Sequence, residues 1–539
     1  MNFVCVALTL HTQIKYVLMN KKFKERTEFN LSQINKDVLA EWDENNIERR
    51  SISEREGCPQ YTFYEGPPSA NGHPGIHHVL ARTIKDVVCR YKTMKGFCVP
   101  RKAGWDTHGL PVELGVEREL GITKEDIGKT ISIEEYNAHC RKNVMKYTAE
   151  WEDLSRKMGY WVDMAHPYIT YENYYIESVW WLLGQMYKKG LVYKGYTIQP
   201  YSPAAGTGLS SHELSLPGCY RDVKDTTVTA QFRIVNPSEE LSQWGVPYFL
   251  AWTTTPWTLA SNTALCVGPN IDYVVVRTYN PYSGKPLTVI LAEERLSAYL
   301  DVKGADIPLE NYKKGDKIIP YSVVSKCKGT ELVGMHYEQL LPYVNPGEEA
   351  FRVIPGDYVT TEDGTGIVHI APTFGADDAH VAKAAGIPPL MIVDKNGTER
   401  PLVDMQGRFY RLEDIDDTFV KEHMNADLYK AYAGRYVKNA YDESLKENDE
   451  TLDVSICMDL KQNDKAFKIE KHVHSYPHCW RTDKPILYYP LDSWFIRSTA
   501  KKERMFELNG TIKCNSDFNS PKKFSMTALS KQFPLRDML

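Results

Sequence analysis

Residues 61–96, YTFYEGPPSANGHPGIHHVLARTIKDVVCRYKTMKG, hold the pattern that decides the fold class. A short aromatic strand is followed by a loop rich in glycine and proline, and apolar residues then recur at helical spacing. Gly96 fits the end of this helix, because glycine readily adopts the left-handed conformation found there. A strand, loop and helix in this order predict the opening unit of a parallel α/β sheet. The apolar positions of the predicted helix are Ile76, Val79, Leu80, Ile84, Val87, Val88 and Tyr91.

The pattern of apolar residues and turn residues changes along the chain from helical to β-rich, which predicts an inserted domain. A second helix is expected over residues 172–189, ending at Gly190. Between residues 225 and 400, short β-rich runs alternate with Gly/Pro/Asn turns, which indicates a β-rich insertion. Residues 438–471 carry no pattern that indicates a function. The three clearest strands of the insertion are expected at residues 248–252, 273–277 and 287–291.

The composition restricts the number of domains, the binding partners and the location of the protein, but it does not identify a function. With 539 residues, 42% of them hydrophobic, the chain can form two to four domains. The net charge of -5 gives no general attraction for nucleic acid, so any RNA contact needs a local basic surface. Eleven cysteines without a Cys-x-x-Cys pair favour a reducing, cytoplasmic location. Residues 1–18 fit neither a signal peptide nor a membrane span, so we treat them as a doubtful extension, with Met19 an alternative start.

A phosphate-binding site is expected where the glycine-rich loop meets the helix at residues 75–78, GIHH. Free backbone N–H groups and the helix dipole attract phosphate at such a position. The side chains of His77 and His78 would add hydrogen-bond donors. By itself this pattern is more often a pair of surface histidines that cap a helix.

The neighbouring residues favour the functional reading. Residues 63–68, FYEGPP, and 70–72, ANG, resemble the segments that precede the ATP site in class I aminoacyl-tRNA synthetases of the isoleucine branch. That family continues with His-Ile-Gly-His, whereas this chain has Gly75 and His77 in exchanged positions. The resemblance implies that His78 and His77 are catalytic ATP contacts, together with Gly75, with His77 substituting for the missing first histidine.

Residues 101–113, RKAGWDTHGLPVE, resemble the amino-acid pocket that distinguishes the isoleucine enzymes of this family. Asp106 would pair with the α-ammonium group of the substrate, and Pro67 would form an apolar wall for its aliphatic side chain. The alternative is an ordinary loop aspartate that caps the following helix.

A second, hydrolytic site is expected from the resemblance. One methylene group contributes only about 1–3 kcal/mol in an apolar pocket, a limit for which the isoleucine enzyme is itself the standard example. Residues 252–259, WTTTPWTL, resemble the threonine-rich peptide of this editing site, and Asn262 follows them. Residues 364–378, GTGIVHIAPTFGADD, resemble its second wall.

The resemblance also assigns roles within the editing site. Asp378 would hold the ammonium group of a mischarged valine, while Thr254 and Thr255 would orient the ester and the attacking water. His369 would contact the side chain or the terminal ribose. Alone, a run of threonines is more typical of a plain β-strand and a single histidine of a core.

A zinc site of the bacterial-type relatives is expected to be lost here. Ser202 and Ala205 stand where those relatives carry a Cys-x-x-Cys pair, and downstream only one cysteine of the second pair is present. One cysteine of four cannot build a tetrahedral structural site, so we expect no metal. The alternative is that the remaining local cluster binds a metal instead of only packing and forming hydrogen bonds; it comprises His472, His474, His478 and Cys479.

The resemblance ends near residue 508, before the second ATP-binding loop and the anticodon-binding domain of the family. We therefore expect a frameshifted or truncated sequence, with an incomplete Rossmann-like parallel-sheet catalytic domain interrupted by a β-rich editing domain. The expected segments are a doubtful extension (1–18), an N-terminal helical segment (19–60), the first part of the catalytic domain (61–220), the inserted editing domain (221–430), the return to the catalytic domain (431–508) and a divergent tail (509–539).

The function implied by the resemblance is that of an isoleucine–tRNA ligase. Such an enzyme activates L-isoleucine with ATP and Mg²⁺, transfers it to tRNA(Ile), and hydrolyses mischarged valine; the family implies a cytoplasmic monomer without membrane contact. Loss of one phosphate-stabilising group typically lowers the rate about 10²–10³-fold, so we expect impaired synthesis. The alternatives are an editing-only aminoacyl-tRNA deacylase and an inert, partly folded fragment.

Overall fold

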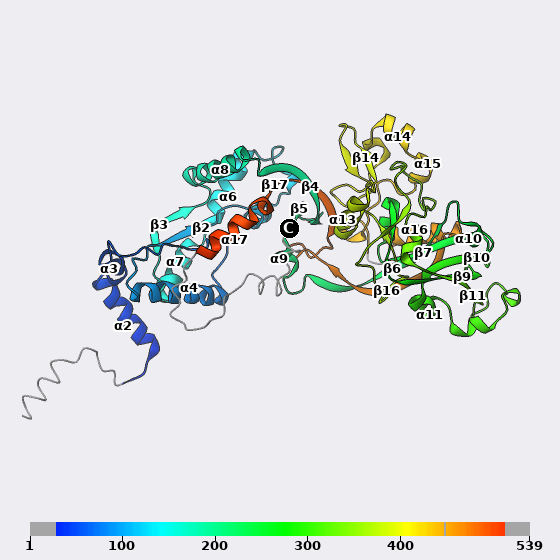
Figure 1. Ribbon diagram of the computed structural model, residues 1–539. Helices are drawn as coiled ribbons and strands as arrows, with labels where there is room; N and C mark the ends of the chain where they lie inside the picture. Colours follow the sequence, from blue (N-terminus) through cyan, green and yellow to red (C-terminus); the bar gives the residue numbers. More distant parts are fainter. Residues whose placement is uncertain (1–27, 447–448, 512–539) are drawn as a thin grey trace, which may run out of the picture. The chain divides into compact units, whose positions relative to one another are not determined.

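The computed structural model describes residues 28–446 and 449–511 (Figure 1). The chain forms two compact units, which we call unit 1 (residues 1–191) and unit 2 (residues 192–539) and describe separately. The extension predicted at residues 1–18 lies outside the described residues, as does the tail from residue 512 onward.

Unit 1 is an α/β unit built on a parallel sheet. The strand order is β1-β2-β3, and both pairings are parallel, which confirms the predicted fold class. The strands are β1 (Phe63–Tyr64), β2 (Arg101–Trp105) and β3 (Asp163–Ile169). The helices are α2 (Leu31–Glu44), α3 (Ile47–Ser53), α4 (Ile76–Met94), α5 (Leu110–Leu120), η1 (Lys124–Asp126), α6 (Ile133–Val144), α7 (Thr148–Lys157) and α8 (Asn173–Lys188).

Two predicted helices of unit 1 are confirmed. The helix predicted from the opening pattern is α4, and Gly96 follows it with a φ of 87°. The helix predicted over residues 172–189 is α8, followed by Gly190 with a φ of 67°. In both places glycine permits the left-handed conformation that ends the helix.

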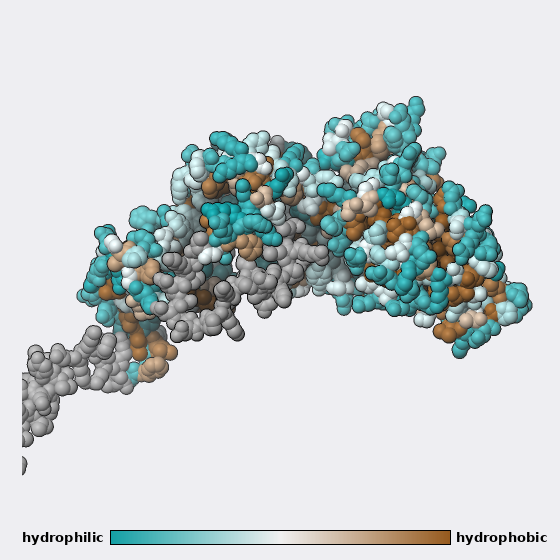
Figure 2. All heavy atoms as spheres, in the orientation of Figure 1, coloured by the Kyte–Doolittle hydropathy of each residue, from teal (hydrophilic) through white to brown (hydrophobic). Residues whose placement is uncertain are grey.

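The apolar side of α4 is exposed. Ile76 is 84% exposed, and Leu80, Ile84 and Val87 are also exposed. The residues that α4 buries are instead Arg82, Cys89 and Thr93. On the face drawn in Figure 2, brown apolar patches interrupt the teal polar surface. Among the described residues, no helix is both long enough and apolar enough to cross a membrane.

Unit 2 contains a six-stranded mixed sheet in the order β11-β9-β10-β7-β6-β16. Only the β10–β7 pairing is parallel within it. Strands β7, β9 and β10 confirm the three strands predicted for the insertion. The strand bounds are β6 (Tyr220–Arg233), β7 (Pro247–Thr253), β9 (Asp272–Tyr279), β10 (Pro286–Ala292), β11 (Ser322–Lys328) and β16 (Ala466–Pro477).

Smaller sheets complete unit 2. One has the order β12-β8-β13, another pairs β14 with β15, and the third has the order β17-β4-β5. Their strands are β4 (Val192–Ser202), β5 (Thr207–Gly208), β8 (Ala264–Val267), β12 (Arg352–Pro355), β13 (Ile367–Ile370), β14 (Met391–Val393), β15 (Glu399–Pro401) and β17 (Leu487–Ile496).

The helices of unit 2 are mostly short, and three of them matter for the site: η2 (Pro256–Ser261), α13 (Ala376–Ala385) and α16 (Leu452–Gln462). The remaining helices are α9 (Ser211–Leu214), α10 (Glu239–Ser242), η3 (Glu293–Arg295), α11 (Leu296–Tyr299), η4 (Val302–Asp306), η5 (Leu309–Asn311), α12 (Gly329–Leu332), η6 (Leu412–Asp414), α14 (Asp417–His423), α15 (Ala426–Tyr429), η7 (Asn439–Tyr441), η8 (Ser498–Lys501) and α17 (Lys502–Thr511).

Long-range pairing brings a late segment of the chain to the insertion. Strand β16 lies within residues 431–508, yet it pairs with β6 over most of its length and forms an edge of the six-stranded sheet. Helix α16, which precedes β16, packs against β6 and η2. Helix α16, which belongs to the unrecognised residues 438–471, therefore lies against the part of the threonine-rich peptide that forms η2.

Candidate functional sites

The predicted ATP loop forms a closed turn at the N-terminus of α4. Gly75 is the N-cap residue, and its backbone N–H donates to Nδ1 of His78 at 2.8 Å. A Cβ atom on Gly75 would lie 2.8 Å from the His77 ring, so glycine leaves room for that ring to fold back. The ring centroids of His77 and His78 are 3.7 Å apart. The structure thus brings the three predicted ATP residues together.

The tautomer and the protonation state of His78 follow from these contacts. Because Nδ1 accepts the Gly75 N–H, the proton of the neutral ring resides on Nε2. Burial, together with His77 and Arg82, lowers the pKa of His78 from its usual value. The ring also packs against Trp151, with centroids 4.6 Å apart. His78 is therefore a fixed neutral ring that presents Nε2–H as its donor.

The predicted amino-acid residues lie at the carboxyl ends of adjacent parallel strands. The backbone N–H of Asp106, just after β2, donates to the carbonyl of Pro68 at 3.0 Å. Half-buried Pro67 is in the loop after β1. Oδ1 of Asp106 is buried without a hydrogen-bond partner, and Nε2 of His108 lies 3.6 Å away. A buried, unsatisfied carboxylate oxygen is unfavourable unless a ligand pairs with it.

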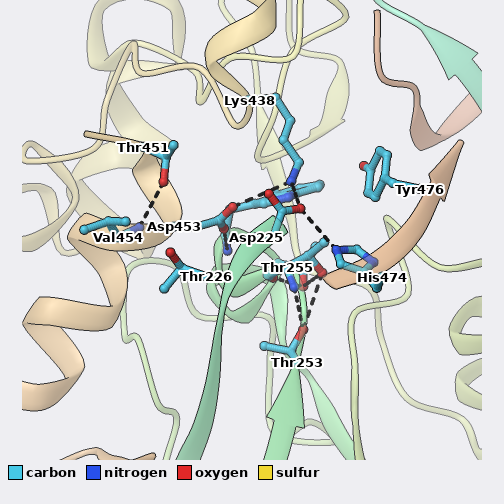
Figure 3. Close-up of polar contacts among 12 residues, drawn as sticks. Asp225, Thr226, Thr253, Thr255, Lys438, Thr451, Asp453, Val454, His474 and Tyr476 are labelled. Carbon is cyan, nitrogen blue, oxygen red and sulfur yellow. Dashed lines mark hydrogen bonds and ion pairs between the residues drawn. The ribbon is translucent and has the colours of Figure 1, made fainter. Parts of the chain in front are cut away.

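In unit 2, the threonine-rich peptide follows β7 and enters η2. The backbone N–H of Thr255 donates to Oγ1 of Thr253 at 3.1 Å, which holds the turn between the two elements (Figure 3). Oγ1 of Thr255 lies 3.3 Å from Oγ1 of Thr258, and the Thr258 hydroxyl donates to the Thr255 carbonyl at 2.8 Å. Thr254 is half-buried in the same turn. The threonine hydroxyl groups of this peptide, which we call the hydroxyl loop, are thus held by hydrogen bonds within the peptide itself.

His369 joins this loop to the second predicted wall. Nε2 of His369, on β13, lies 3.1 Å from Oγ1 of Thr258. Since the Thr258 hydroxyl already donates to a carbonyl, Nε2–H of His369 is the donor. Burial lowers the pKa of His369 to about 4, so the ring is neutral at pH 7. Its Nδ1 is then a buried acceptor without a hydrogen-bond partner.

An aromatic contact supports the same junction. The rings of Trp257 in η2 and Phe374 in the second wall meet edge to face, with centroids 4.9 Å apart. A Cβ atom on Gly364, which has a φ of 63°, would lie 3.2 Å from Trp252. The two segments resembling the editing walls are therefore packed against each other in unit 2.

Two other predicted editing residues, Asp378 and Asn262, have hydrogen-bond partners outside the threonine peptide. Oδ2 of Asp378, in the first turn of α13, accepts the backbone N–H of Ala371 at 2.8 Å. Burial raises the pKa of Asp378 to about 6. The Asn262 side chain donates to the Ala264 carbonyl at 2.8 Å and accepts from the hydroxyl of Tyr337. Asn262 thus bonds to the core and, through a 3.4 Å hydrogen bond from its side chain to the Ile370 carbonyl, to the second wall, whereas no hydrogen bond links Asp378 to the threonine peptide.

The histidines of the expected zinc remnant have other partners. Nε2 of His474 lies 3.2 Å from Oδ2 of Asp225, and Nδ1 of His478 lies 2.9 Å from the Tyr476 carbonyl. Cys479 is buried. Within residues 28–446 and 449–511, no group of three or more His, Cys, Asp or Glu side chains is arranged to hold a metal ion.

Pattern reading missed three residues that shape the unit 2 site. Thr258 and Trp257 were within the quoted peptide, but only the structure shows that they connect it to the second wall. Asp453 accepts the backbone N–H of Trp257 at 3.0 Å, although 196 residues separate the two. No local sequence signal identifies such a contact.

Comparison with known proteins now fixes the family. The model of the class I tRNA synthetases for I, L, M and V matches residues 37–531. The chain belongs to this family. Isoleucine–tRNA ligase of Bacteroides fragilis (strain ATCC 25285) is 72% identical over 494 residues, covering 92% of this class I synthetase chain. The ligase of Bacteroides thetaiotaomicron is 66% identical over 515 residues, also covering 92%.

The class I synthetase chain is shorter than these relatives. It spans 43% of the length of the first ligase and 44% of the second. A solved structure of GlLeuRS-CP1 aligns with 46% of this chain and 99% of its own, at 17% identity and a TM-score of 0.27.

Proposed function

We propose that this chain is part of an isoleucine–tRNA ligase and that unit 2 carries its hydrolytic site for mischarged valine. The observation that carries the proposal is the Thr258–His369 hydrogen bond, which connects the threonine peptide to the second wall. The high identity of both relatives named isoleucine–tRNA ligase supports the choice of isoleucine and tRNA(Ile). A cytoplasmic location follows from the role of such ligases in translation.

The hydrolytic chemistry assigns a role to each polar group. With a pKa of about 6, Asp378 is mostly ionised at pH 7 and would hold the ammonium group of the valyl ester. Nδ1 of neutral His369 would accept a hydrogen bond from a hydroxyl group of the terminal ribose. The hydroxyl of Thr255, and the adjoining Thr254, would orient the attacking water and the ester carbonyl.

Unit 1 would bind the substrates of activation. The N-terminus of α4 and Nε2–H of His78 would hold the phosphates of ATP, which enters with Mg²⁺, with His77 and Gly75 beside them. Oδ1 of Asp106, which lies 3.6 Å from Nε2 of His108 but has no hydrogen-bond partner, would accept from the α-ammonium group of isoleucine, and Pro67 would form its apolar wall. We propose this as the binding half of adenylate formation.

We also propose that hydrolysis by this chain exceeds its synthesis. The hydroxyl loop of unit 2 is held by buried hydrogen bonds, whereas the loops of unit 1 lie on a three-stranded sheet whose helix α4 exposes its apolar side. Catalysis depends on groups held in place before the reaction, which favours unit 2.

The test runs two assays on the purified chain in parallel. One follows deacylation of valyl-tRNA(Ile), and the other follows pyrophosphate exchange with ATP, Mg²⁺ and isoleucine. We expect deacylation above the spontaneous rate and exchange at background. Exchange without deacylation would reverse the assignment, and inactivity in both assays would favour an inert fragment.

A further inference from the structure

A buried cluster of charged side chains lies beside the threonine peptide in unit 2 (Figure 3). Nζ of Lys438 is 2.7 Å from Oδ2 of Asp225 and 3.8 Å from Oδ2 of Asp453. The side chains of Lys438 and Asp453 are only 12% and 4% exposed. Nζ also lies 4.9 Å from the centroid of the Tyr476 ring, and His474 contacts Asp225. Neither the predicted sites nor the proposed chemistry uses this cluster.

The cluster is bonded to the peptide through Asp453. This residue is in the first turn of α16, and its Oδ1 accepts the backbone N–H of Trp257 at 3.0 Å. Trp257 is in the first turn of η2, where backbone N–H groups have no partner within the helix. Asp453 therefore supplies, from a distant part of the chain, the acceptor that fixes the start of η2.

The buried carboxylate of Asp453 also has a cation beside it. An ionised carboxylate buried without one is strongly unfavourable, and Lys438 forms the ion pair with Asp453, with a smaller electrostatic contribution from Lys471. Burial raises the pKa of Asp453 to about 6, although Lys438 and the Trp257 N–H oppose the rise. For Asp225, burial alone would raise the pKa, but Lys438 and His474 lower it below its usual value. Both carboxylates thus share one lysine.

We propose that Asp453, paired with Lys438, is a positioning residue that holds residues 253–258 in the geometry required for hydrolysis. The inference rests on the proposed hydrolytic function for its effect on rate. Asp453 acts through the backbone of Trp257, two residues after Thr255 and one before Thr258, so it aligns both hydroxyl groups without contacting the substrate.

The alternative is that the cluster only stabilises unit 2. Two substitutions at one position distinguish these roles. Asp453→Ala removes the acceptor for the Trp257 N–H, whereas Asp453→Asn keeps an oxygen in the same place. Asp394→Ala is the matched control, because Asp394 is also buried and accepts backbone N–H groups, but its partners are Asn396, Thr398 and Arg400.

The experiment uses the full chain and measures kcat and KM for deacylation of valyl-tRNA(Ile), together with the melting temperature. We expect Asp453→Ala to lower kcat about 10- to 100-fold with KM changed less than about twofold, because small displacements of reacting groups have effects of this size. Asp453→Asn should keep kcat within about threefold of the parent. Asp394→Ala should lower the melting temperature but not kcat.

Hydrogen–deuterium exchange of the peptide covering residues 253–262 gives a readout that needs no activity. Asp453→Ala should speed exchange in this peptide, and Asp453→Asn and Asp394→Ala should not. An unchanged kcat and exchange rate in Asp453→Ala would overturn the positioning role while leaving the hydrolytic function standing. If the parent chain does not deacylate, the hydrolytic function fails, and the exchange result alone decides whether Asp453 positions the peptide.

Discussion

Units 1 and 2 differ in how completely the side chains of their helices and strands are buried. Among the described residues, every one of the largest fully buried side chains belongs to unit 2, including Phe232, Tyr273 and Tyr429. The buried clusters of unit 1 are small, and α8 buries none of its residues. Trp180 on α8 is 72% exposed. A site on a closely packed core is held more rigidly than loops on a thinly covered sheet.

The same difference separates the two candidate sites. In unit 2 the hydroxyl loop has buried partners at both ends, namely His369 and, through Trp257, Asp453. In unit 1 the oxygen of Asp106 has no hydrogen-bond partner. We infer that the hydroxyl loop of unit 2 is held at both ends, whereas in unit 1 the His78 ring is fixed but the Asp106 carboxylate oxygen is not.

The largest expected effect concerns the cores. Phe232→Ala should lower the free energy of unfolding of unit 2 by about 3–5 kcal/mol, because it removes a fully buried ring that packs against Tyr337. Trp180→Ala in unit 1 should change stability by less than about 0.5 kcal/mol, because its ring is exposed. Urea titration with hydrogen exchange resolved by peptide measures each unit separately. Similar decreases in the free energy of unfolding for both variants would contradict the inference that unit 2 has the more closely packed core.

The second effect concerns the hydroxyl loop. Thr258→Val should lower kcat for deacylation about 10- to 100-fold, because it removes the acceptor of His369 and frees the ring to turn. Thr288→Val is the matched control: it also loses a buried threonine hydroxyl, bonded to the Trp244 carbonyl, yet should retain kcat within about twofold. Equal losses of rate in both variants would mean that general destabilisation, not the loop, explains the effect.

Local patterns predicted the elements of both units well. The period of apolar residues and the stop glycines located α4 and α8, and β-rich runs located β7, β9 and β10. The exposed side of α4 was not predictable, because the period identifies a helix but not what covers it. The late strand β16 joined the sheet of the insertion through pairing with β6, which no local pattern specifies.

Sequence resemblance named residues of the unit 2 site but not their bonding. Asn262 follows the threonine peptide closely in sequence, yet its amide is bonded to the carbonyls of Ala264 and Ile370 and to the hydroxyl of Tyr337. The contact between Asp453 and Trp257 links segments far apart in the chain, so only the fold reveals it. The assignment of catalytic, ATP-binding and editing roles to individual side chains stays a prediction.

The third effect uses pH to separate function from stability in unit 2. The folded-state pKa of Asp378, about 6, lies above the ordinary value of 3.8, so folding favours its protonated form and ionisation above pH 6 destabilises the unit. Asp378→Asn should therefore stabilise unit 2 by about 1–2 kcal/mol at pH 7.5, and the gain should disappear as pH falls from 6 to below 4. Unfolding of both proteins at pH 7.5, 6 and 4 measures this.

The exposed neighbour Asp377 supplies the control for that series. Asp377→Asn should change stability little at any of these pH values, since an exposed carboxyl keeps its water in both states. We also expect Asp378→Asn to lose deacylation, because the ammonium group loses its partner. A variant that is less stable at pH 7.5, or equally altered at every pH, would refute the burial of this carboxylate.

The smallest expected effect tests whether the two units differ in local structure as well as in their cores. Ser132 caps α6 in unit 1 by accepting the Glu135 N–H at 3.1 Å, and Ser238 caps α10 in unit 2 by accepting the Leu241 N–H at 3.3 Å. Both serines are exposed, so Ser132→Ala and Ser238→Ala should each cost about 0.5–1 kcal/mol. Equal losses, measured by the same peptide-resolved exchange, would place the difference between the units in packing. A loss confined to unit 2 would mean that the helices of unit 1 are themselves only partly formed.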